Sequence, residues 1–469
     1  MKEKQKKQKK PFKIPHTYVI LGIIIVIMAV LTWIVPAGEF DRVVDEASGR
    51  TLVVPGSYHE VEGNPVGLFR LLTLVQEAMI DSSGIIFFIF FAYAFVYMQM
   101  KCGAFDAAVG AMLRKLHEHK MFIIPLFMLI FGLCGSTFGM TEETFGFIPV
   151  FMGIAVALRY DALVGGAMVY VGVITGFASA TVNPFTIGVA HTIAELPMFS
   201  GLWFRCIVFA VFMCVSMWYV MRYAKKVQKE PRLSIVKDVE LSAEGLSEEE
   251  LMKTEFTVKH KISMLLFLIT VILIMFGAIK LGWYINEIAG LFIGMMILVG
   301  LIQGYNFSEI AQIFIEACRD IMFGALVCGV AKTILLVMQD GMIIDTFTNA
   351  IVGIADTNNK YLSAFMMLIT QNLLNFFIPS GSGQAVTSMP IMVPIADMVK
   401  LPRQVAVLAY QFGDGFSNMI WPTSVATWCG MMKLPMDKWY KFVLPLGGIL
   451  LALETVFIMI ATAINYGPF

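Results

Sequence analysis

The chain contains repeated apolar runs that are long enough to cross a membrane, such as YVILGIIIVIMAVLTWIV at residues 18–35. An α-helix needs about 20 apolar residues to span the roughly 30 Å hydrocarbon core of a bilayer. The composition agrees, because 58% of the 469 residues are hydrophobic and 14% are charged, whereas a soluble chain carries about 25% charged residues. These features predict an all-α integral membrane protein.

Several function classes find no support in the composition or the motifs. The formal net charge is zero, which argues against a nucleic-acid partner. The 7 cysteines lie in or beside apolar runs without CxxC spacing, which is typical of packing residues rather than metal ligands. The sequence has no nucleophile–base pair, HExxH or phosphate-binding Gly-rich loop, so it predicts neither an enzyme nor an ATP-driven pump, and no cofactor beyond a coupling ion.

Basic segments set the expected orientation in the membrane. The Lys-rich leader at 1–17 predicts a cytoplasmic N-terminus, and a first transmembrane helix is expected at 18–36. The polar segment 223–262 predicts a cytoplasmic linker between two membrane halves, because the stretch from 222 to 262 holds nine Lys and Arg residues. Within this linker, SEEE at 247–250 is typical of a helix start.

The two halves resemble each other in sequence. Four matches occur in the same order with offsets between 235 and 241 residues: EAMID (77–81) with EACRD (316–320), MQMKCG (98–103) with MQDG (338–341), ETFGFIP (143–149) with QAVTSMP (384–390), and NPFT (183–186) with NMIWPT (418–423). The pattern predicts two duplicated units, at 66–222 and 305–463, with a helix pair at 263–304 between them.

Counting membrane crossings from a cytoplasmic N-terminus turns the second unit upside down relative to the first. The expected architecture is about nine transmembrane helices plus two opposed re-entrant hairpins in an inverted repeat, with the C-terminus outside. Amphipathic stretches at 68–81 and 308–320 predict interfacial helices that brace each unit. Inverted units with interrupted apolar segments are the signature of secondary transporters, because broken backbone in a bilayer is tolerated only beside a cavity or buried in protein.

Four interrupted segments, at 135–144, 179–186, 379–388 and 413–424, combine Gly or Pro with Ser, Thr or Asn. Small and hydroxylated residues also let membrane helices pack closely, so the four matched clusters carry the prediction rather than any single residue. The candidate substrate-binding residues are Ser136, Thr137, Thr141, Glu142, Glu143, Asn183, Pro184, Thr186, Lys332, Ser380, Gly381, Ser382, Gly383, Gln384, Asp414, Asn418, Thr423 and Ser424. Among these, Asn183, Asn418 and Asp414 are candidate Na⁺ ligands through their oxygen atoms.

Ionisable groups within the bilayer by default have a partner or a function, because burying one costs at least about 2.5 kcal/mol. Glu142, Glu143 and Asp414 fall in the interrupted segments, where they could coordinate Na⁺, carry a proton or pair with a cationic substrate. A protein cation is the alternative partner, and Lys332 is the candidate for it, although Lys332 could equally meet a substrate carboxylate. Three further residues are compatible with either a structural or a functional role: His191, Glu195 and Glu454.

Six motifs distributed over the chain resemble one known family: VPAGEF, TEETFGFIPV, NPFTIGVA, FIPSGSGQA, MPIMVPIAD and YQFGDGFSNMIWPTS. The chain resembles YfcC-type carriers of the DcuC-like C4-dicarboxylate and basic amino acid carrier group in the ion transporter superfamily. The resemblance implies secondary transport of small carboxylated metabolites, a scaffold and a transport domain, and a homodimer in the cell membrane. Members of this family often carry Arg near position 332, and Lys332 lacks the planar fork that clamps a carboxylate with two bonds.

The balance of charges favours a particular substrate class. Three acids against one Lys favour a cationic or zwitterionic solute, such as arginine or ornithine, moved by exchange or together with Na⁺ or H⁺. A C4-dicarboxylate carrier is the alternative within transporters. A membrane channel is the alternative outside them, although a channel does not need opposed hairpins.

Overall fold

The computed structural model describes residues 16–45, 50–116, 120–239, 253–277, 281, 283 and 285–467. Within these ranges most residues are helical, and five helices are long and apolar enough to cross a membrane: α3 (Ser83–Lys101), α9 (Leu202–Lys229), α12 (Ile285–Gln303), α13 (Phe307–Asp340) and α19 (Met436–Ala463). Shorter apolar helices are α1 (Thr17–Leu31), α5 (Ile123–Phe138) and α7 (Ala162–Ala178). The protein is therefore a helical multi-pass membrane protein, as predicted. The leader before residue 16 and the expected helix start at 247–250 lie outside the described residues.

The remaining helices are shorter or more polar. They are α2 (Leu68–Asp81), α4 (Ala104–Leu116), α6 (Ile148–Ala157), α8 (Val189–Ile193), α11 (Val258–Phe276), α14 (Ile344–Gly353), α15 (Lys360–Phe377), α16 (Gly381–Met398), α17 (Arg403–Ser417) and α18 (Pro422–Met431). Single turns lie at η1 (Lys120–Phe122), η2 (Glu142–Phe147), η3 (Pro184–Gly188) and η4 (Pro231–Leu233).

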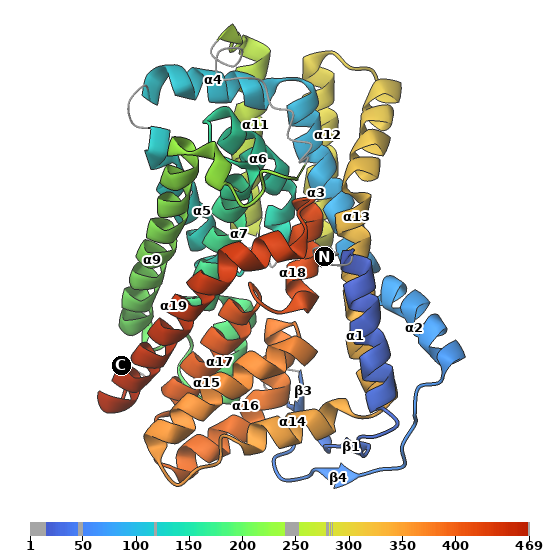
Figure 1. Cartoon of the computed structure of the whole chain (residues 1–469), viewed down its shortest axis with the longest axis vertical. Coiled ribbons are helices and arrows are strands. Elements are labelled where there is room, and N and C mark those ends of the chain that lie inside the picture. The colour runs from blue at the N-terminus through green and yellow to red at the C-terminus, as the bar shows by residue number, and fades with distance from the viewer. Residues whose placement is uncertain are drawn as a thin grey trace, which may run out of the picture.

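One group of helices forms around α13. Helices α1, α2 and α3 pack against α13, and α12 packs against α3, so this group occupies one side of the molecule (Figure 1). Two ion pairs fasten α2 to α13, namely Arg70 Nη2–Asp340 Oδ1 at 2.6 Å and Lys332 Nζ–Asp81 Oδ2 at 2.9 Å. The prediction of a separate helix at 308–320 was wrong, because these residues form the first part of α13 without a break.

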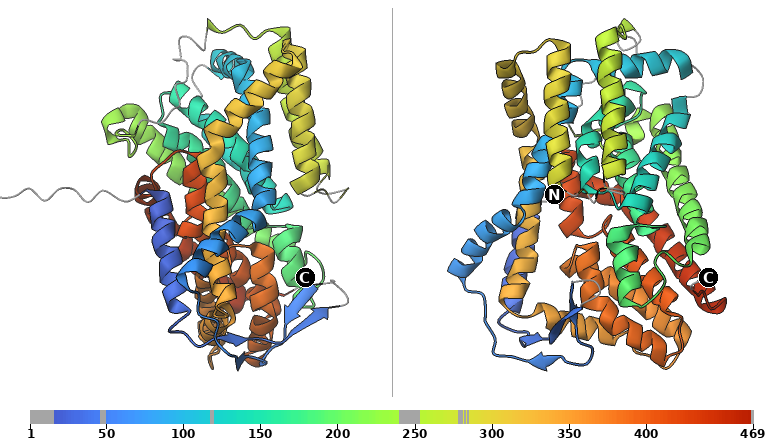
Figure 2. Two further views of the ribbon diagram at one scale, coloured as in Figure 1. Left: turned by 90° about the vertical axis from the view of Figure 1, so that its right-hand side faces the viewer. Right: turned by 180° about the vertical axis from the view of Figure 1, so that it is seen from behind.

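A second group contains two helical hairpins and the helices that support them. The first hairpin is α5–η2–α6, which packs on α7, and the second is α15–α16, which packs on α17. The two hairpins lie in opposite halves of the molecule, the first beside α4 and the second beside α14 (Figures 1 and 2). Helices α9 and α19 pack on α7 and α17 respectively, so each half has the same local arrangement.

A segment of short strands follows α1 and reaches across to the second hairpin. Its strands are β1 (Gly38–Glu39), β2 (Arg42–Asp45), β3 (Arg50–Val53) and β4 (His59–Glu60), paired antiparallel as β1–β4 and β2–β3. Arg42 forms an ion pair of 2.7 Å with Asp345 of α14, and β3 contacts α16. This strand segment therefore ties the end of α1 to the end of the molecule that carries α14 and α16 (Figure 2).

Candidate functional site

A cavity of about 200 Å³ lies between the group around α13 and the hairpin group. It is lined by Ser82, Ile85, Thr141, Glu142, Phe145, Ile174, Phe177, Cys328, Ala331, Lys332, Pro379, Asn418, Ser424, Thr427 and Trp428. These residues come from the start of α3, the turn η2, the end of α7, α13, the segment between α15 and α16, the junction between α17 and α18, and α18 itself. Three of the four interrupted segments of the sequence thus reach one cavity, whereas no residue of the fourth, 179–186, lines it.

Among the described residues that line this cavity, Glu142 and Lys332 carry formal charges of opposite sign. They lie on different elements, because Glu142 belongs to η2 and Lys332 to α13. Lys332 forms an ion pair with Asp81, and the Lys332 side chain keeps an exposed fraction of 35%. The expected pairing of Lys332 with Glu142, Glu143 or Asp414 is therefore not what the structure shows.

Local hydrogen bonds from Thr141 fix the carboxylates of Glu142 and Glu143 in the turn η2. Helix α5 is followed by its C-cap residue Gly139, which has a φ of 68°. Downstream, the backbone N–H of Thr141 donates to Oε2 of Glu143 at 3.1 Å, and the Thr141 hydroxyl donates to the Glu142 carboxylate. A side chain at position 139 would collide with Asn183, since an added Cβ would lie 2.6 Å from its Oδ1. Glycine at this position therefore lets the first hairpin tip approach the first break.

The first break separates α7 from α8. Asn183 Oδ1 accepts a hydrogen bond of 2.9 Å from the backbone N–H of Phe185 and so starts the turn η3 with Pro184. Ser136 of α5 is bonded to this break, because its Oγ accepts from the Thr181 backbone N–H at 3.0 Å. The first hairpin and the first break are thus held as one unit.

The second break separates α17 from α18 and is cross-linked by amides. Asn375 Nδ2 donates to the Asp414 carbonyl at 2.9 Å and to Ser417 Oγ at 2.6 Å. Asn418 Nδ2 donates to the same carbonyl at 2.7 Å, and its Oδ1 accepts from Ser424 Oγ at 2.7 Å. The Asn418 amide is therefore engaged within the protein, which makes it a poorer Na⁺ ligand than expected.

The tip of the second hairpin meets both breaks. Ser380 Oγ caps α16 by accepting from the Gly383 N–H at 3.3 Å. An added Cβ on Gly381 would lie 2.6 Å from the Thr186 methyl carbon and 3.0 Å from Asp414 Oδ2. Gly381 thus lies directly against a residue of the first break and a residue of the second.

Buried polar atoms without a hydrogen-bond partner gather around these tips and breaks. Within the described residues nine such side-chain atoms occur, and seven belong to this region: Asn183 Nδ2, Thr186 Oγ1, Asn375 Oδ1, Gln384 Oε1, Gln411 Oε1, Asp414 Oδ2 and Thr423 Oγ1. An unsatisfied buried polar group costs about 1–3 kcal/mol, so such atoms are candidates for binding a water, an ion or a solute. The concentration of these atoms in one region, rather than any single atom, makes the region a candidate ligand site.

The predicted site residues fall into two sets. Five of them line the cavity: Thr141, Glu142, Lys332, Asn418 and Ser424. The others belong to the hairpin tips and breaks but do not line it: Ser136, Thr137, Glu143, Asn183, Pro184, Thr186, Ser380, Gly381, Ser382, Gly383, Gln384, Asp414 and Thr423. Thr137 donates to the Leu133 carbonyl of its own helix at 2.5 Å, and Gln384 Nε2 donates to Oε1 of Gln371 at 2.7 Å.

Sequence reasoning missed several residues of this region, among them Asp81, Asn375, Gln411, Thr427 and Trp428. Asn375 stands one turn before the second tip in NFFIPSGSGQ, and an amide in an apolar run was a usable signal. Asp81 gave no such signal, because its partner lies 251 residues away.

Three acids and bases that the sequence left open are paired outside the cavity. His191 is buried and lies 3.2 Å from Gln404 Oε1. Glu195 forms an ion pair of 2.9 Å with Arg403, and Glu454 accepts from Asn372 at 3.5 Å.

The family model described as "C4-dicarboxylate anaerobic carrier" (DcuC) matches residues 14–463. The chain belongs to the DcuC family of carriers. An Escherichia coli protein named "Putative basic amino acid antiporter YfcC" is 30% identical over 98% of this chain and 99% of its own length. An uncharacterized protein of Haemophilus influenzae is 26% identical over 98% of this chain and 99% of its own length.

The crystal structure of the YdaH transporter of Alcanivorax borkumensis aligns with a TM-score of 0.42 at 15% identity, covering 97% of this chain and 100% of that one.

Proposed function

We propose that this carrier moves a small amino acid with a cationic side chain, such as arginine or ornithine, by secondary active transport. The transport would run as an exchange or be coupled to Na⁺ or H⁺. The observation that carries this proposal is the cavity that presents Glu142 from η2 and Lys332 from α13.

The two charges suit the two ends of a zwitterionic solute. Lys332 can receive an α-carboxylate, and Glu142 can receive an ammonium or guanidinium group. The cavity also has aromatic lining from Phe145, Phe177 and Trp428, which is compatible with a cation because ring faces attract positive charge. Its volume of about 200 Å³ fits a small metabolite, being below the range of about 300–1,000 Å³ typical of drug-sized ligand pockets.

A C4-dicarboxylate carrier is the second candidate, favoured by the description of the family. The printed name of the E. coli relative favours the basic amino acid instead. Among the described residues that line the cavity, Lys332 is the one cation, and Glu142 would repel a second carboxylate. We therefore rank the dicarboxylate below the amino acid.

We further propose that residues 66–222 and 305–463 form an inverted repeat with two opposed re-entrant hairpins, within about nine transmembrane helices. Backbone geometry supports this proposal. Three pairs of positive-φ residues stand 239, 241 and 238 residues apart: Gly103 with Met342, Arg159 with Lys400, and Glu195 with Lys433. A recurrent left-handed turn at matched positions is expected if both units share one chain path.

Side-chain pairing supports the same repeat. Asp81 forms an ion pair with Lys332, and Asp320 accepts a hydrogen bond of 2.5 Å from the Tyr93 hydroxyl. Asp320 lies 239 residues after Asp81, and Lys332 lies 239 residues after Tyr93, so the two contacts join equivalent positions of the two units. Reciprocal contacts of this kind are what a pseudo-twofold axis between the two units would produce.

We propose Asp414 as the centre of a coupling site for Na⁺ or H⁺. Its Oδ2 is buried and has no hydrogen-bond partner among the described residues, and Thr186 Oγ1 is in the same situation. Both residues adjoin Gly381. Carboxylate and hydroxyl oxygens are ligands that hard cations accept.

We also propose that the carrier is a homodimer, with its N-terminus in the cytoplasm and its C-terminus outside.

Exchange in proteoliposomes tests the transport proposal. Purified protein is reconstituted, the lumen is loaded with unlabelled arginine, and entry of labelled arginine is followed with external ornithine, succinate or malate as competitors. We expect saturable counterflow of arginine that ornithine inhibits. Exchange of succinate or malate without any amine would assign the protein to the dicarboxylate class, and flux without counterflow would indicate a channel.

A further inference from the structure

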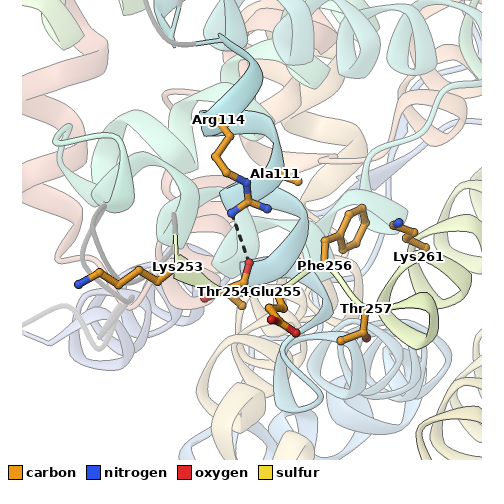
Figure 3. A pocket seen from close by; sticks show the side chains of 8 residues that line it. All are labelled: Ala111, Arg114, Lys253, Thr254, Glu255, Phe256, Thr257 and Lys261. Atoms are coloured by element: carbon orange, nitrogen blue, oxygen red, sulfur yellow. Dashed lines mark hydrogen bonds between the residues drawn. The ribbon is translucent and has the colours of Figure 1, made fainter.

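A second hollow of about 700 Å³ lies far from the transport cavity, between α4 and the start of α11. Its lining is Ala111, Arg114, Lys253, Thr254, Glu255, Phe256, Thr257 and Lys261 (Figure 3). Three cationic side chains face one acid in this set, so the groove is positively charged. The transport proposal makes no use of it.

Local contacts fix the shape of this groove. Arg114 Nη1 donates to the Thr254 carbonyl at 3.3 Å, which joins α4 to the segment before α11. In Figure 3, Lys253 and Lys261 lie on opposite sides of this contact. Lys261 stands 5.9 Å from the centre of the Phe256 ring. The groove is therefore a built feature with cations on either side, not a chance gap.

The start of α11 adds to the positive potential. Thr257 is the N-cap residue of α11, and its side chain accepts from the His260 backbone N–H at 3.3 Å. The N-terminus of a helix carries a partial positive charge and free N–H groups. The groove thus combines a helix N-terminus with three cationic side chains.

The face of α11 below the groove is apolar and exposed. Five residues at helical spacing have exposed fractions between 39% and 55%: Ile262, Leu265, Leu268, Ile272 and Phe276. A row of exposed apolar side chains of this kind is suited to contact with lipid tails. The groove lies at the end of this row, which is where a phospholipid carries its headgroup.

We propose that this groove binds the phosphate of an anionic phospholipid, with the acyl chains lying along the exposed face of α11. Arg114, Lys253 and Lys261 would neutralise the headgroup. We favour a lipid over a soluble anion because the cations lie at the end of an apolar row, and a lipid has both a charged headgroup and apolar chains. Basic clusters next to the membrane bind anionic headgroups through such complementarity.

Lipid retention in purified protein tests this inference. Protein is incorporated into nanodiscs of equal phosphatidylglycerol and phosphatidylcholine, extracted in mild detergent, and its bound lipid is counted by native mass spectrometry. We expect the wild type to retain phosphatidylglycerol several-fold over phosphatidylcholine. The triple variant Arg114→Gln, Lys253→Gln, Lys261→Gln is expected to retain both lipids equally.

A matched control removes the same charge at the same end of the molecule. The control variant Lys225→Gln, Lys229→Gln, Arg232→Gln changes exposed residues at the end of α9 and just beyond it, and should keep the wild-type preference. The double variant Lys253→Gln, Lys261→Gln leaves the Arg114 contact with Thr254 intact and is expected to lose most of the preference.

Three outcomes would overturn the proposal. The first is an unchanged lipid preference in the triple and double variants. The second is an equal loss in the control, which would make the effect one of net charge. The third is protection of the wild type against heat by inorganic phosphate as large as that given by phosphatidylglycerol, which would make the groove a site for soluble phosphate.

Discussion

The most informative comparison between single residues is that of Lys332 with Tyr93. Both hold an aspartate on a neighbouring helix, Asp81 in one case and Asp320 in the other. The two aspartates differ in their cations, because Asp320 also forms an ion pair of 2.5 Å with Lys433, whereas the ion pair of Asp81 is with Lys332 itself. Lys332 also lines the cavity, where we propose that it meets the carboxylate of the solute.

Lys332→Tyr tests this reasoning. The phenol should keep a bond to Asp81 while the cavity loses its cation, so we expect uptake of arginine to fall at least tenfold. Agmatine, which is arginine without its carboxylate, should bind the variant as well as it binds the wild type. The measurement is competition against labelled arginine in proteoliposomes, with melting temperature as the check on folding.

Tyr93→Phe is the matched control, because it breaks the other pair outside the cavity. Loss of a hydrogen bond to a charged group should destabilise the protein by about 1.5–3 kcal/mol, with the KM for arginine unchanged. If Lys332→Tyr still binds arginine more tightly than agmatine, as the wild type does, Lys332 does not recognise the solute. This outcome would leave open whether arginine is transported.

Asp414→Asn tests the coupling site. The amide has the same shape but lacks the negative charge that a cation needs. We expect the dependence of transport on Na⁺ concentration or on pH to disappear, while arginine exchange at saturating solute persists. Initial rates across a series of Na⁺ concentrations and pH values give the answer, with Asp397→Asn, which changes a residue paired with Arg403, as the control. An unaltered ion dependence in Asp414→Asn would exclude this carboxylate.

At the scale of elements, the first hairpin depends on Gly139. A non-Gly residue at a φ of 68° costs about 1–2 kcal/mol, and an added Cβ would also meet Asn183 at 2.6 Å. We expect Gly139→Ala to lower the melting temperature by several degrees and to impair transport. Gly153→Ala in α6 of the same hairpin is the control: nothing lies within 4 Å of its added Cβ, and alanine favours a helix over glycine by about 1 kcal/mol. Equal melting temperatures of the two variants would contradict the role given to Gly139.

The sequence predicted elements well where a local signal marked their ends. The stretch 68–81 was expected as an amphipathic helix and is α2. The stretch at 308–320 carried the same signal but continues into α13. The reason is that unit one has Ser82, Ser83 and Gly84 after its helix, whereas unit two has Ile321, Met322 and Phe323 at the matched positions. Apolar residues give the second helix no reason to end.

At the scale of the whole molecule, what escaped the sequence was the pairing of distant residues. The interrupted segments were recognisable from Gly, Pro and hydroxylated residues, and three of them do reach the cavity. The bond between Lys332 and Asp81 was not recognisable, since helical periodicity says nothing about contacts between elements far apart in the chain. The same limit concealed Asn375, which binds the second break from another helix.

The strand segment after α1 makes a prediction at this scale. Arg42 neutralises the negative charge of Asp345, whose side chain is only 4% exposed. Arg42→Gln would leave this carboxylate without its cation, and we expect a loss of about 1–2 kcal/mol, discounted because Arg42 itself is partly exposed. Limited proteolysis of the strand segment should become faster. Lys360→Gln, at the first residue of α15, is the control, and equal cleavage rates in both variants would show that the ion pair does not hold the segment.

The contact of Gly381 with Thr186 and Asp414 has a consequence for the order of events in a transport cycle. If Asp414 binds the coupling ion as we propose, the hairpin tip seated there would have to move, with α16, before an ion could reach or leave it. An ion already in place would be occluded, and its release would wait for the tip to lift. The rate of ion exchange should therefore be limited by the rate at which the hairpin opens. A variant in which α15 is cross-linked to α17 should slow both rates by the same factor.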